Sequence, residues 1–383
     1  MGVFSLDWLN FYLYFKNDLL IIIISFLITS IISLLIVRYK KLHLSFTADS
    51  YLLGVQKFHT TVVPRVGGIA IFLGILVAFL VHYFQNSQVI FFSLILLVCS
   101  LPAFLSGLIE DLTKKVGVKI RLLATIMSAL LAGIFLDAWL GSVQVMGIDN
   151  LMLAYPLVAV AITCFAVGGV ANAFNIIDGY NGLSSMVAVI VLSGIAFVAF
   201  QVNDHPIMIA ALSMIGALLG FLVFNYPRGV IFLGDGGAYF VGCWIAELSV
   251  LLTVRHPEVS KWFPLLLCLY PIFETIFTIY RRVVLQKAHP GMPDALHLHQ
   301  LIYMRIVRPS IGGHSDAAKA QCNALTSPYL WILTTFAAIP AILFWQYHQI
   351  LKGFALLFAV TYVWLYWAIV RFKSPKWMRL RVF

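Results

Sequence analysis

Five short segments hold most of the residues in this sequence that could perform chemistry. One is NAFNIIDGYNGL, residues 172–183, in which Asn172, Asn175 and Asp178 recur every three residues. On a continuing helix these side chains share one face, and the glycines that follow end the helix and let the backbone approach a ligand. Two amides and a carboxylate beside such a turn predict a polar binding site. A capped helix end followed by a solvated loop is the alternative.

Carboxylates mark two further segments. SGLIEDLTKKVGVKIR contains Glu110 and Asp111, followed by Lys115, and FLGDGGAYF places Asp235 among glycines at the start of an apolar run. Adjacent carboxylates repel each other unless a cation lies between them, and Mg²⁺ binds one or two carboxylates together with phosphates. These patterns indicate a metal and diphosphate site, whereas ordinary helix capping is the alternative for both segments.

Basic and imidazole groups mark the last two segments. In QKFHTTVVPRVGGIAIF, Lys57 precedes a Gly-rich helix start, where free backbone N–H groups bind phosphate. A positive anchor at the membrane surface is the alternative there. In QKAHPGMPDALHLHQL, His297 and His299 lie two residues apart and face one side of an extended segment. With Asp294 nearby, zinc ligation is one interpretation, and hydrogen bonds to a ribose, uracil or phosphate are another.

The elements that position these segments are membrane helices. The chain has 383 residues, 62% hydrophobic and 10% charged, with a mean hydropathy of +0.98, whereas soluble domains are about 25% charged. This composition predicts an all-α polytopic membrane protein with a single integral-membrane domain over residues 1–383. None of the five cysteines forms a CxxC pair, so disulfides and a structural zinc are not expected. Eleven apolar runs are long enough to span a bilayer, at 19–37, 67–84, 89–108, 120–136, 151–171, 183–201, 207–225, 238–254, 263–280, 327–346 and 350–370.

The distribution of basic residues predicts the orientation of these runs. When the connecting segments are assigned alternately to two sides, one side holds all of the 25 Lys and Arg residues except Lys16, Arg255, Lys261 and Lys352. Basic loops face the cytoplasm, so we expect a periplasmic N-terminus, a cytoplasmic C-terminus and all five segments on the cytoplasmic face. The net charge of +10 then favours anionic lipids and substrates as partners instead of nucleic acid.

Taken in order, the motifs PRVGGIAIF, EDLTKK, NAFNIIDGYNGL, FLGDGGAYF and HLHQL resemble the polyprenyl-phosphate N-acetylhexosamine-1-phosphate transferases. This family includes undecaprenyl-phosphate GlcNAc-1-phosphate transferase and phospho-MurNAc-pentapeptide translocase. The resemblance extends from about Lys57 to Gln300, and NAFNIIDG with His-Leu-His is closer to the branch that transfers simple N-acetylhexosamine phosphates. The chain departs from the family in having Glu110 in a usual aspartate pair and Asn181 in a usual DGxDG motif. The second departure places more weight on Asp178.

The resemblance implies that undecaprenyl phosphate attacks the β-phosphate of a UDP-N-acetylhexosamine in a bacterial cytoplasmic membrane. UMP leaves, and the lipid diphosphate sugar initiates a cell-surface glycan such as O-antigen, lipopolysaccharide or capsule. The sugar, whether GlcNAc, GalNAc, QuiNAc or FucNAc, is left open, and a homodimer is an assembly that the family precedent suggests. The implied roles are Mg²⁺ binding, with Mn²⁺ as an alternative, by Asp235 and Asp111; orientation or deprotonation of the lipid phosphate by Asp178; phosphate binding by Lys57 and Lys115; substrate orientation by Asn172 and Asn175; and nucleotide contacts by His297 and His299.

Two other classes of function compete with this interpretation. A transporter of a nucleotide sugar or lipid-linked sugar would place ionisable residues near the bilayer midplane, often within inverted repeats. The sequence shows no such repeat, and its polar clusters lie at one predicted surface. A non-catalytic scaffold is the third class, and the departures at Glu110 and Asn181 favour it slightly.

Overall fold

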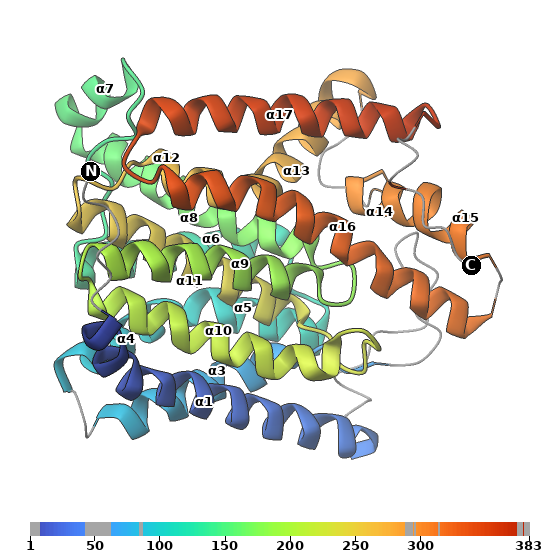
Figure 1. Ribbon diagram of the computed structural model, residues 1–383, viewed down its shortest axis with the longest axis horizontal. Coiled ribbons are helices and arrows are strands. Elements are labelled where there is room, and N and C mark those ends of the chain that lie inside the picture. The colour runs from blue at the N-terminus through green and yellow to red at the C-terminus, as the bar shows by residue number, and fades with distance from the viewer. Residues whose placement is uncertain are drawn as a thin grey trace.

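The computed structural model describes residues 8–42, 63–83, 87–287, 294, 296–312, 315–373 and 378. Within these residues the chain is helical and has no strand, which confirms the predicted all-α class. The helices lie roughly parallel or antiparallel to one another, as Figure 1 shows. The long ones are α1 (Trp8–Arg38), α3 (Gly67–Tyr83), α4 (Ser87–Cys99), α5 (Leu101–Thr113), α6 (Val118–Leu136), α8 (Pro156–Ile177), α9 (Leu183–Gln201), α10 (His205–Asn225), α11 (Gly234–Arg255), α13 (Leu269–Tyr280), α16 (Asp316–Leu343) and α17 (His348–Val370).

Shorter helices occupy the connections. In Figure 1, α7 and α14 lie at opposite ends of the bundle, so the described connections form two separate faces. The shorter elements are α7 (Ile148–Ala154), α12 (Trp262–Leu267), the π-helix η1 (Arg281–Leu285), α14 (Leu298–Ile302), the π-helix η2 (Tyr303–Val307) and α15 (Arg308–Ile311).

The eleven predicted spans each overlap one helix or two consecutive helices. By length and composition, eight of the described helices can cross a membrane, and the number reaches nine when the bent pair α4 and α5 counts as one span. Helix α3 is apolar but has only 17 residues, and the predicted run 263–280 is divided between α12 and α13 at Cys268. The count of eleven and the orientation in the membrane therefore stay predictions.

The break between α4 and α5 has a side-chain partner. The two helices meet at Ser100 with a bend of 45°, and Pro102 lies in the first turn of α5, where its missing N–H does no harm. The Ser100 hydroxyl donates a hydrogen bond of 2.8 Å to Glu247 of α11, and the thiol of Cys243 donates to the same carboxyl group at 3.3 Å. Glu247, an acid within an apolar run, therefore connects α11 to the bend between α4 and α5.

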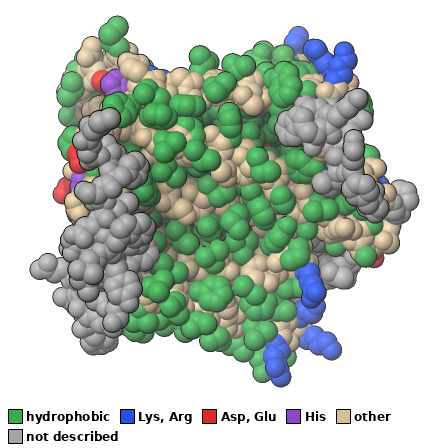
Figure 2. All heavy atoms as spheres, viewed as in Figure 1, with side chains coloured by type: hydrophobic (Ala, Val, Ile, Leu, Met, Phe, Trp, Pro, Cys, Tyr) green, Lys and Arg blue, Asp and Glu red, His purple; other side chains and the backbone are tan. Residues whose placement is uncertain are grey.

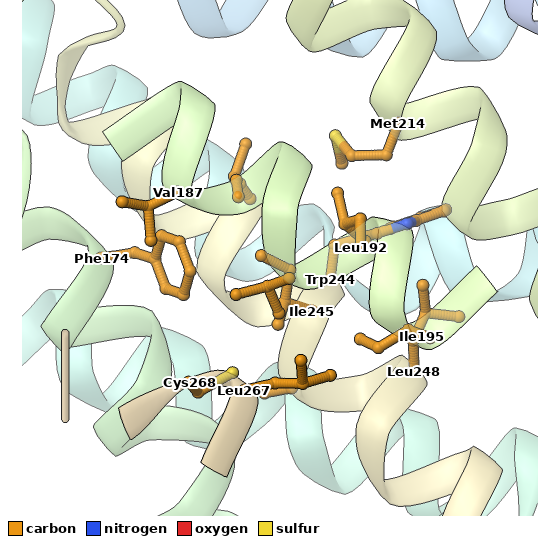
Figure 3. Packing of buried hydrophobic residues seen from close by; sticks show 14 of the residues in the cluster. Phe174, Val187, Leu192, Ile195, Met214, Trp244, Ile245, Leu248, Leu267 and Cys268 are labelled. Carbon is orange, nitrogen blue, oxygen red and sulfur yellow. The ribbon is translucent and has the colours of Figure 1, made fainter. Parts of the chain in front are cut away.

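Helix α11 lies at the centre of the bundle. In its most apolar window, 94% of the residues are buried inside the protein. Figure 3 shows Trp244 and Ile245 of this helix packed among Phe174, Val187 and Met214 from neighbouring helices. A Cβ atom at Gly242 would lie 2.7 Å from the Cα of Ala171, so α8 and α11 approach closely because Gly242 lacks a side chain. Because α11 lies at the centre of the bundle, residues of several neighbouring helices can reach the polar residues at its N-terminus.

The outer surface separates apolar and charged side chains. Figure 2 shows hydrophobic side chains over the middle of the visible face, Lys and Arg toward the end that bears α14 and α15, and acidic residues and histidine mainly toward the other end. Exposed apolar residues along the helices, such as Phe165 at 81% exposure, suit contact with lipid tails. The basic end is the one that the sequence predicts to be cytoplasmic.

Candidate active site

The N-terminus of α11 is held by a carboxylate from another helix. Asp111, near the end of α5, accepts hydrogen bonds from the backbone N–H of Asp235 at 2.9 Å and from that of Gly236 at 2.8 Å. Its two oxygens each bind one of these donors, and the residue is 1% exposed. The free N–H groups at a helix start favour such a negative partner. In this structure Asp111, which was predicted to bind metal, caps the helix that contains Asp235.

Glycines allow the backbones around this cap to meet. A Cβ atom at Gly107 of α5 would lie 2.5 Å from the amide nitrogen of Gly236. A Cβ atom at Gly68 of α3 would lie 2.5 Å from the amide nitrogen of Gly237. Since real Cβ atoms do not come so close to backbone atoms, α3, α5 and α11 can only make this three-way contact with glycine at these positions.

The Asp235 side chain binds two arginines and one amide. Arg121 of α6 forms an ion pair with one carboxylate oxygen through Nη1. The other oxygen accepts a hydrogen bond of 3.0 Å from the side-chain amide of Asn175, and Nη2 of Arg65 lies 3.5 Å away. Side-chain exposure is 10% for Arg121 and 15% for Asp235, and hydrogen bonds between charged groups are strong in such surroundings. The cluster therefore holds positive groups that can bind phosphate beside carboxylates that can bind a cation.

One face of α8 contributes the predicted Asn-Asn-Asp series. The helix continues to Ile177, so Asn172, Asn175 and Asp178 lie along one side as expected. The side-chain oxygen of Asn172 accepts a hydrogen bond of 3.1 Å from the Tyr239 hydroxyl of α11. Asn175 reaches Asp235 one turn later along the same face, and Asp178 caps the end of the helix. Helix α8 thus lines the cluster that begins at α11.

Asp178 shares the electrostatic environment of this cluster. Burial raises its pKa to about 7, the positive charge of Arg65 lowers it, and the carboxylates of Asp235 and Asp111 raise it. Three acids that interact in this way cannot all ionise easily without positive charge among them. The arginines supply part of that charge in the structure.

Asn181 lies in different surroundings from Asp178. It is 1% exposed, and its side-chain amide donates a hydrogen bond of 2.8 Å to the backbone carbonyl of Pro227. This contact ties the turn after α8 to the segment between α10 and α11. The residue at which the chain departs from the family pattern therefore makes a structural contact.

The two predicted histidines are buried and stacked. Their ring centroids lie 5.1 Å apart. His297 caps α14, and its Nδ1 lies 3.2 Å from the carboxylate of Glu274. His299 contacts Tyr180 edge to face at 5.5 Å, and a Cβ atom at Gly179 would lie 3.5 Å from its Nε2. Burial lowers the pKa of His299 to about 3, so the ring is neutral at physiological pH. His299 therefore borders the turn that follows Asp178.

The structure brings together Asp111, Asn172, Asn175, Asp178 and Asp235, with His299 beside the turn. Lys115 is exposed, and its side chain has no ion pair or hydrogen bond among the described residues. Lys57 falls outside the described residues. Site roles for these two lysines stay predictions.

Sequence reasoning missed the part played by Arg121 and Glu274. Arg121 was counted only among the basic residues that orient the chain. The sequence feature that could have identified Arg121 is its charge at the start of a predicted membrane helix, close in sequence to Glu110 and Asp111. Glu274 was assigned no role, although an ionisable residue within an apolar run is itself a signal. Its carboxylate is buried and accepts hydrogen bonds from the Tyr362 hydroxyl at 2.8 Å and the Leu298 N–H at 2.9 Å.

The donor atoms fit a hard cation better than zinc. No group of three or more His, Cys, Asp or Glu side chains among the described residues could hold a metal ion. Zinc takes three or four protein ligands, so the described residues alone form no zinc site at His297 and His299; His289 lies outside them. Mg²⁺ needs only one or two carboxylates when substrate phosphates and water complete its shell. Asp235 and Asp178, both near Arg65, offer that donor set.

Comparison with known proteins points in the same direction. The sequence model of the family Glycosyl transferase family 4 matches residues 93–253. The chain is 31% identical over 284 residues to the undecaprenyl-phosphate alpha-N-acetylglucosaminyl 1-phosphate transferase of Thermotoga maritima, covering 74% of this chain and 80% of that protein. It is 32% identical over 251 residues to a probable undecaprenyl-phosphate N-acetylglucosaminyl 1-phosphate transferase of Bacillus subtilis, covering 64% and 66%. It is 30% identical over 239 residues to the phospho-N-acetylmuramoyl-pentapeptide-transferase of Carboxydothermus hydrogenoformans, covering 58% and 70%.

Proposed function

Because this chain belongs to glycosyl transferase family 4, we propose that it transfers an N-acetylhexosamine 1-phosphate from a UDP-sugar to undecaprenyl phosphate. An oxygen of the lipid phosphate forms a bond to the β-phosphorus of the UDP-sugar. The bond between that phosphorus and the bridging oxygen breaks, and UMP leaves with the electron pair. The product is a lipid diphosphate sugar, which in a bacterial cytoplasmic membrane would initiate a cell-surface glycan.

The observation that supports this proposal most directly is the cluster at the N-terminus of α11. Two carboxylates, Asp178 and Asp235, and two guanidinium groups, Arg65 and Arg121, meet at one end of an apolar bundle. Phosphoryl transfer needs in-line positioning and neutralisation of charge more than it needs covalent help from the protein. A mixed acidic and basic cluster at a membrane surface suits a reaction between a lipid phosphate and a soluble nucleotide.

The chain's own residues have separable tasks in this proposal. Arg65 and Arg121 bind phosphate oxygens, since a guanidinium group donates paired hydrogen bonds to such anions. Asp178 orients the lipid phosphate or accepts its remaining proton. A phosphate monoester, with a second pKa of about 6, is already largely ionised at pH 7, so little base strength is required of Asp178. Asn175 holds Asp235 in place through its hydrogen bond.

Asp235 would hold Mg²⁺, or Mn²⁺ as an alternative, with Asp178 as a second carboxylate in the same electrostatic environment. When bound, the cation would neutralise the diphosphate and the departing UMP. Asp111 has its oxygens on the α11 backbone, so its task in the proposal is to position Asp235. His299 and Asn172 would contact the nucleotide or the sugar, and His297 would orient His299 by stacking.

The test is release of UMP by purified protein given Mg²⁺, undecaprenyl phosphate and a panel of UDP-N-acetylhexosamines. UDP-GlcNAc is the first candidate, because the named relatives from Thermotoga and Bacillus act on that sugar by their names. We expect Asp178→Asn and Asp235→Asn each to lower turnover by about a hundredfold or more. Asp316→Asn, an exposed acid paired with Lys319, is the matched control and should turn over normally.

Two outcomes would contradict the proposal. Near-normal turnover in both active-site variants would show that the residue roles are wrong. Accumulation of a UDP-sugar inside proteoliposomes without any UMP release would show that the protein is a transporter.

A further inference from the structure

The turn after α8 is bound by a row of side chains from α16. The backbone N–H of Asn181 donates to the side-chain oxygen of Asn323 at 2.8 Å. The backbone carbonyl of Asn181 accepts from the Ser327 hydroxyl at 2.7 Å. The carbonyl of Gly182 accepts from the indole N–H of Trp331 at 3.1 Å. Three side chains of one distant helix therefore satisfy three of the four backbone polar groups of Asn181 and Gly182.

The spacing of these side chains explains how one helix can reach the whole turn. Asn323, Ser327 and Trp331 are four residues apart, which places them on one face of α16 over successive turns. Asn323 and Ser327 are fully buried. Buried polar groups in a membrane protein are costly unless they are hydrogen-bonded, and the turn supplies the partners. This polar row therefore stabilises one particular path of the turn.

Side-chain amides hold the turn from its other side. The N–H of Gly182 donates to the side-chain oxygen of Asn225 at 2.6 Å, and the same Asn225 donates to the carbonyl of Ile231 at 2.8 Å. Asn181 donates from its own side chain to Pro227. Gly182 has a φ of +70°, and a Cβ atom there would lie 2.9 Å from the Tyr226 ring. The turn is thus enclosed between α16 and the segment after α10.

The enclosed turn begins at Asp178. Helix α8 ends at Ile177 and α9 begins at Leu183, so only five residues separate them, and the last two are bound at both backbone groups. Little freedom remains for the first three. The position of Asp178, at the start of this turn, is consequently set in part by α16.

We propose that Asn323, Ser327 and Trp331 of α16 form a positioning clamp that holds Asp178 in its reactive place. The inference rests on the proposed function for its kinetic consequence. The three residues touch the backbone of the turn and not the reacting groups, so they are positioning residues. Helix α16 lies beyond residues 93–253, the part of the chain that matches the family description.

Hydrogen–deuterium exchange tests the clamp without reference to activity. Asn323→Ala removes the acceptor of the Asn181 N–H, so deuterium uptake in a peptide covering 178–183 should become about tenfold faster or more, as expected for loss of a buried hydrogen bond. Asn323→Asp keeps an acceptor oxygen and should restore protection. Ser327→Ala and Trp331→Phe each remove one other contact and provide independent variants if the first folds poorly.

Thr326→Ala is the matched control. Thr326 is also fully buried, but its hydroxyl donates only within α16, to the carbonyl of Cys322 at 2.8 Å. Exchange of the turn should stay at the wild-type rate in this variant. In the UMP-release assay, Ser327→Ala should lower kcat about tenfold with KM for the UDP-sugar nearly unchanged, whereas Thr326→Ala should leave both constants within about twofold of wild type.

The outcomes separate the two proposals. Unchanged exchange of the turn in Asn323→Ala, or equal kcat in Ser327→Ala and Thr326→Ala, would overturn the clamp. If exchange is faster in the clamp variants but the wild-type protein releases no UMP with any UDP-sugar, the clamp is supported as a structural device and the proposed function is overturned.

Discussion

The carboxylate of Asp111 accepts a hydrogen bond of 2.9 Å from the backbone N–H of Asp235. One acid of the cluster therefore sets the position of another. Asp111 caps a helix, whereas Asp235 faces the proposed substrate site. The sequence motifs do not distinguish these two tasks, since either acid can be indispensable.

Asp111→Asn should impair both folding and turnover. The amide keeps one acceptor oxygen but presents an NH₂ group to the other backbone donor, so a buried N–H is left without a partner at a cost of about 1–3 kcal/mol. We expect a lower midpoint of thermal unfolding and a turnover reduced about tenfold or more. Glu110→Gln is the control, because among the described residues Glu110 accepts a side-chain hydrogen bond only from the N–H of Val116, just beyond the end of α5. Equal unfolding midpoints in the two variants would contradict the capping role.

Arg121→Gln should strengthen the binding of Mg²⁺ in the absence of substrate. The guanidinium group of Arg121 neutralises Asp235, and a cation that binds there must compete with it. The thermal shift caused by Mg²⁺ should reach its half-maximum at a lower concentration in the variant, while KM for the UDP-sugar rises because a phosphate-binding group is lost. Lys119→Gln removes an exposed charge from the same helix and should leave the titration unchanged. A wild-type magnesium titration in Arg121→Gln would count against this competition.

Asp178 should change its protonation near neutral pH in the metal-free protein. Burial raises its pKa to about 7, against the opposing effect of Arg65. Carbodiimides react with protonated carboxyl groups, so labelling of Asp178, followed by peptide mass spectrometry, should fall as pH rises through about 7. Because folding raises this pKa, the stability that the protonated group contributes is complete below about pH 4 and is lost as pH rises through the folded value.

Arg65→Gln tests the direction in which Arg65 shifts the pKa of Asp178. Removal of the positive charge disfavours the carboxylate and raises the pKa of Asp178 further, so labelling should persist to higher pH. A labelling curve centred near the ordinary aspartate pKa of about 4, or one that moves to lower pH in the variant, would contradict the assigned environment.

Asn181→Asp should destabilise this protein, although it restores the usual family motif. The side chain of Asn181 donates to the carbonyl of Pro227, and an ionised carboxylate would instead repel that oxygen in a buried place. We expect a lower unfolding midpoint at neutral pH that recovers partly as pH falls, since a protonated acid can donate again. Asn181→Gln keeps the donor but lengthens the side chain and separates the effect of charge from that of size. An unchanged midpoint at pH 7 in Asn181→Asp would show that the contact is unimportant.

The parts of this site that depend on local pattern could be predicted. The three-residue spacing of Asn172, Asn175 and Asp178 implied a shared face, and the helix does continue to Ile177. The distribution of basic residues predicted that the five polar segments share one surface, and the described parts of these segments do meet around the N-terminus of α11 and the turn after α8.

The pairings between helices could not be predicted. Arg121 and Asp235 are 114 positions apart, and their contact depends on how far each helix is rotated about its own axis. Composition also does not reveal the bend at Ser100 or the break at Cys268. The hydrogen bonds of α16 to the turn were missed for the same reason, since a buried Asn or Ser in an apolar run shows no sign of its partner.

The glycine contacts among α3, α5 and α11 have a consequence for experiments that rank residues by tolerance to substitution. Any side chain at Gly68, Gly107 or Gly236 would meet backbone atoms at under 3 Å, so the helices would move apart and take Asp111 away from the helix that it caps. A deep mutational scan would therefore score these glycines as severely as the acids of the cluster. A residue at this end of the bundle can therefore be intolerant to substitution because three helix backbones pack closely there or because it takes part in the reaction. Only a measurement that separates folding from turnover can distinguish the two.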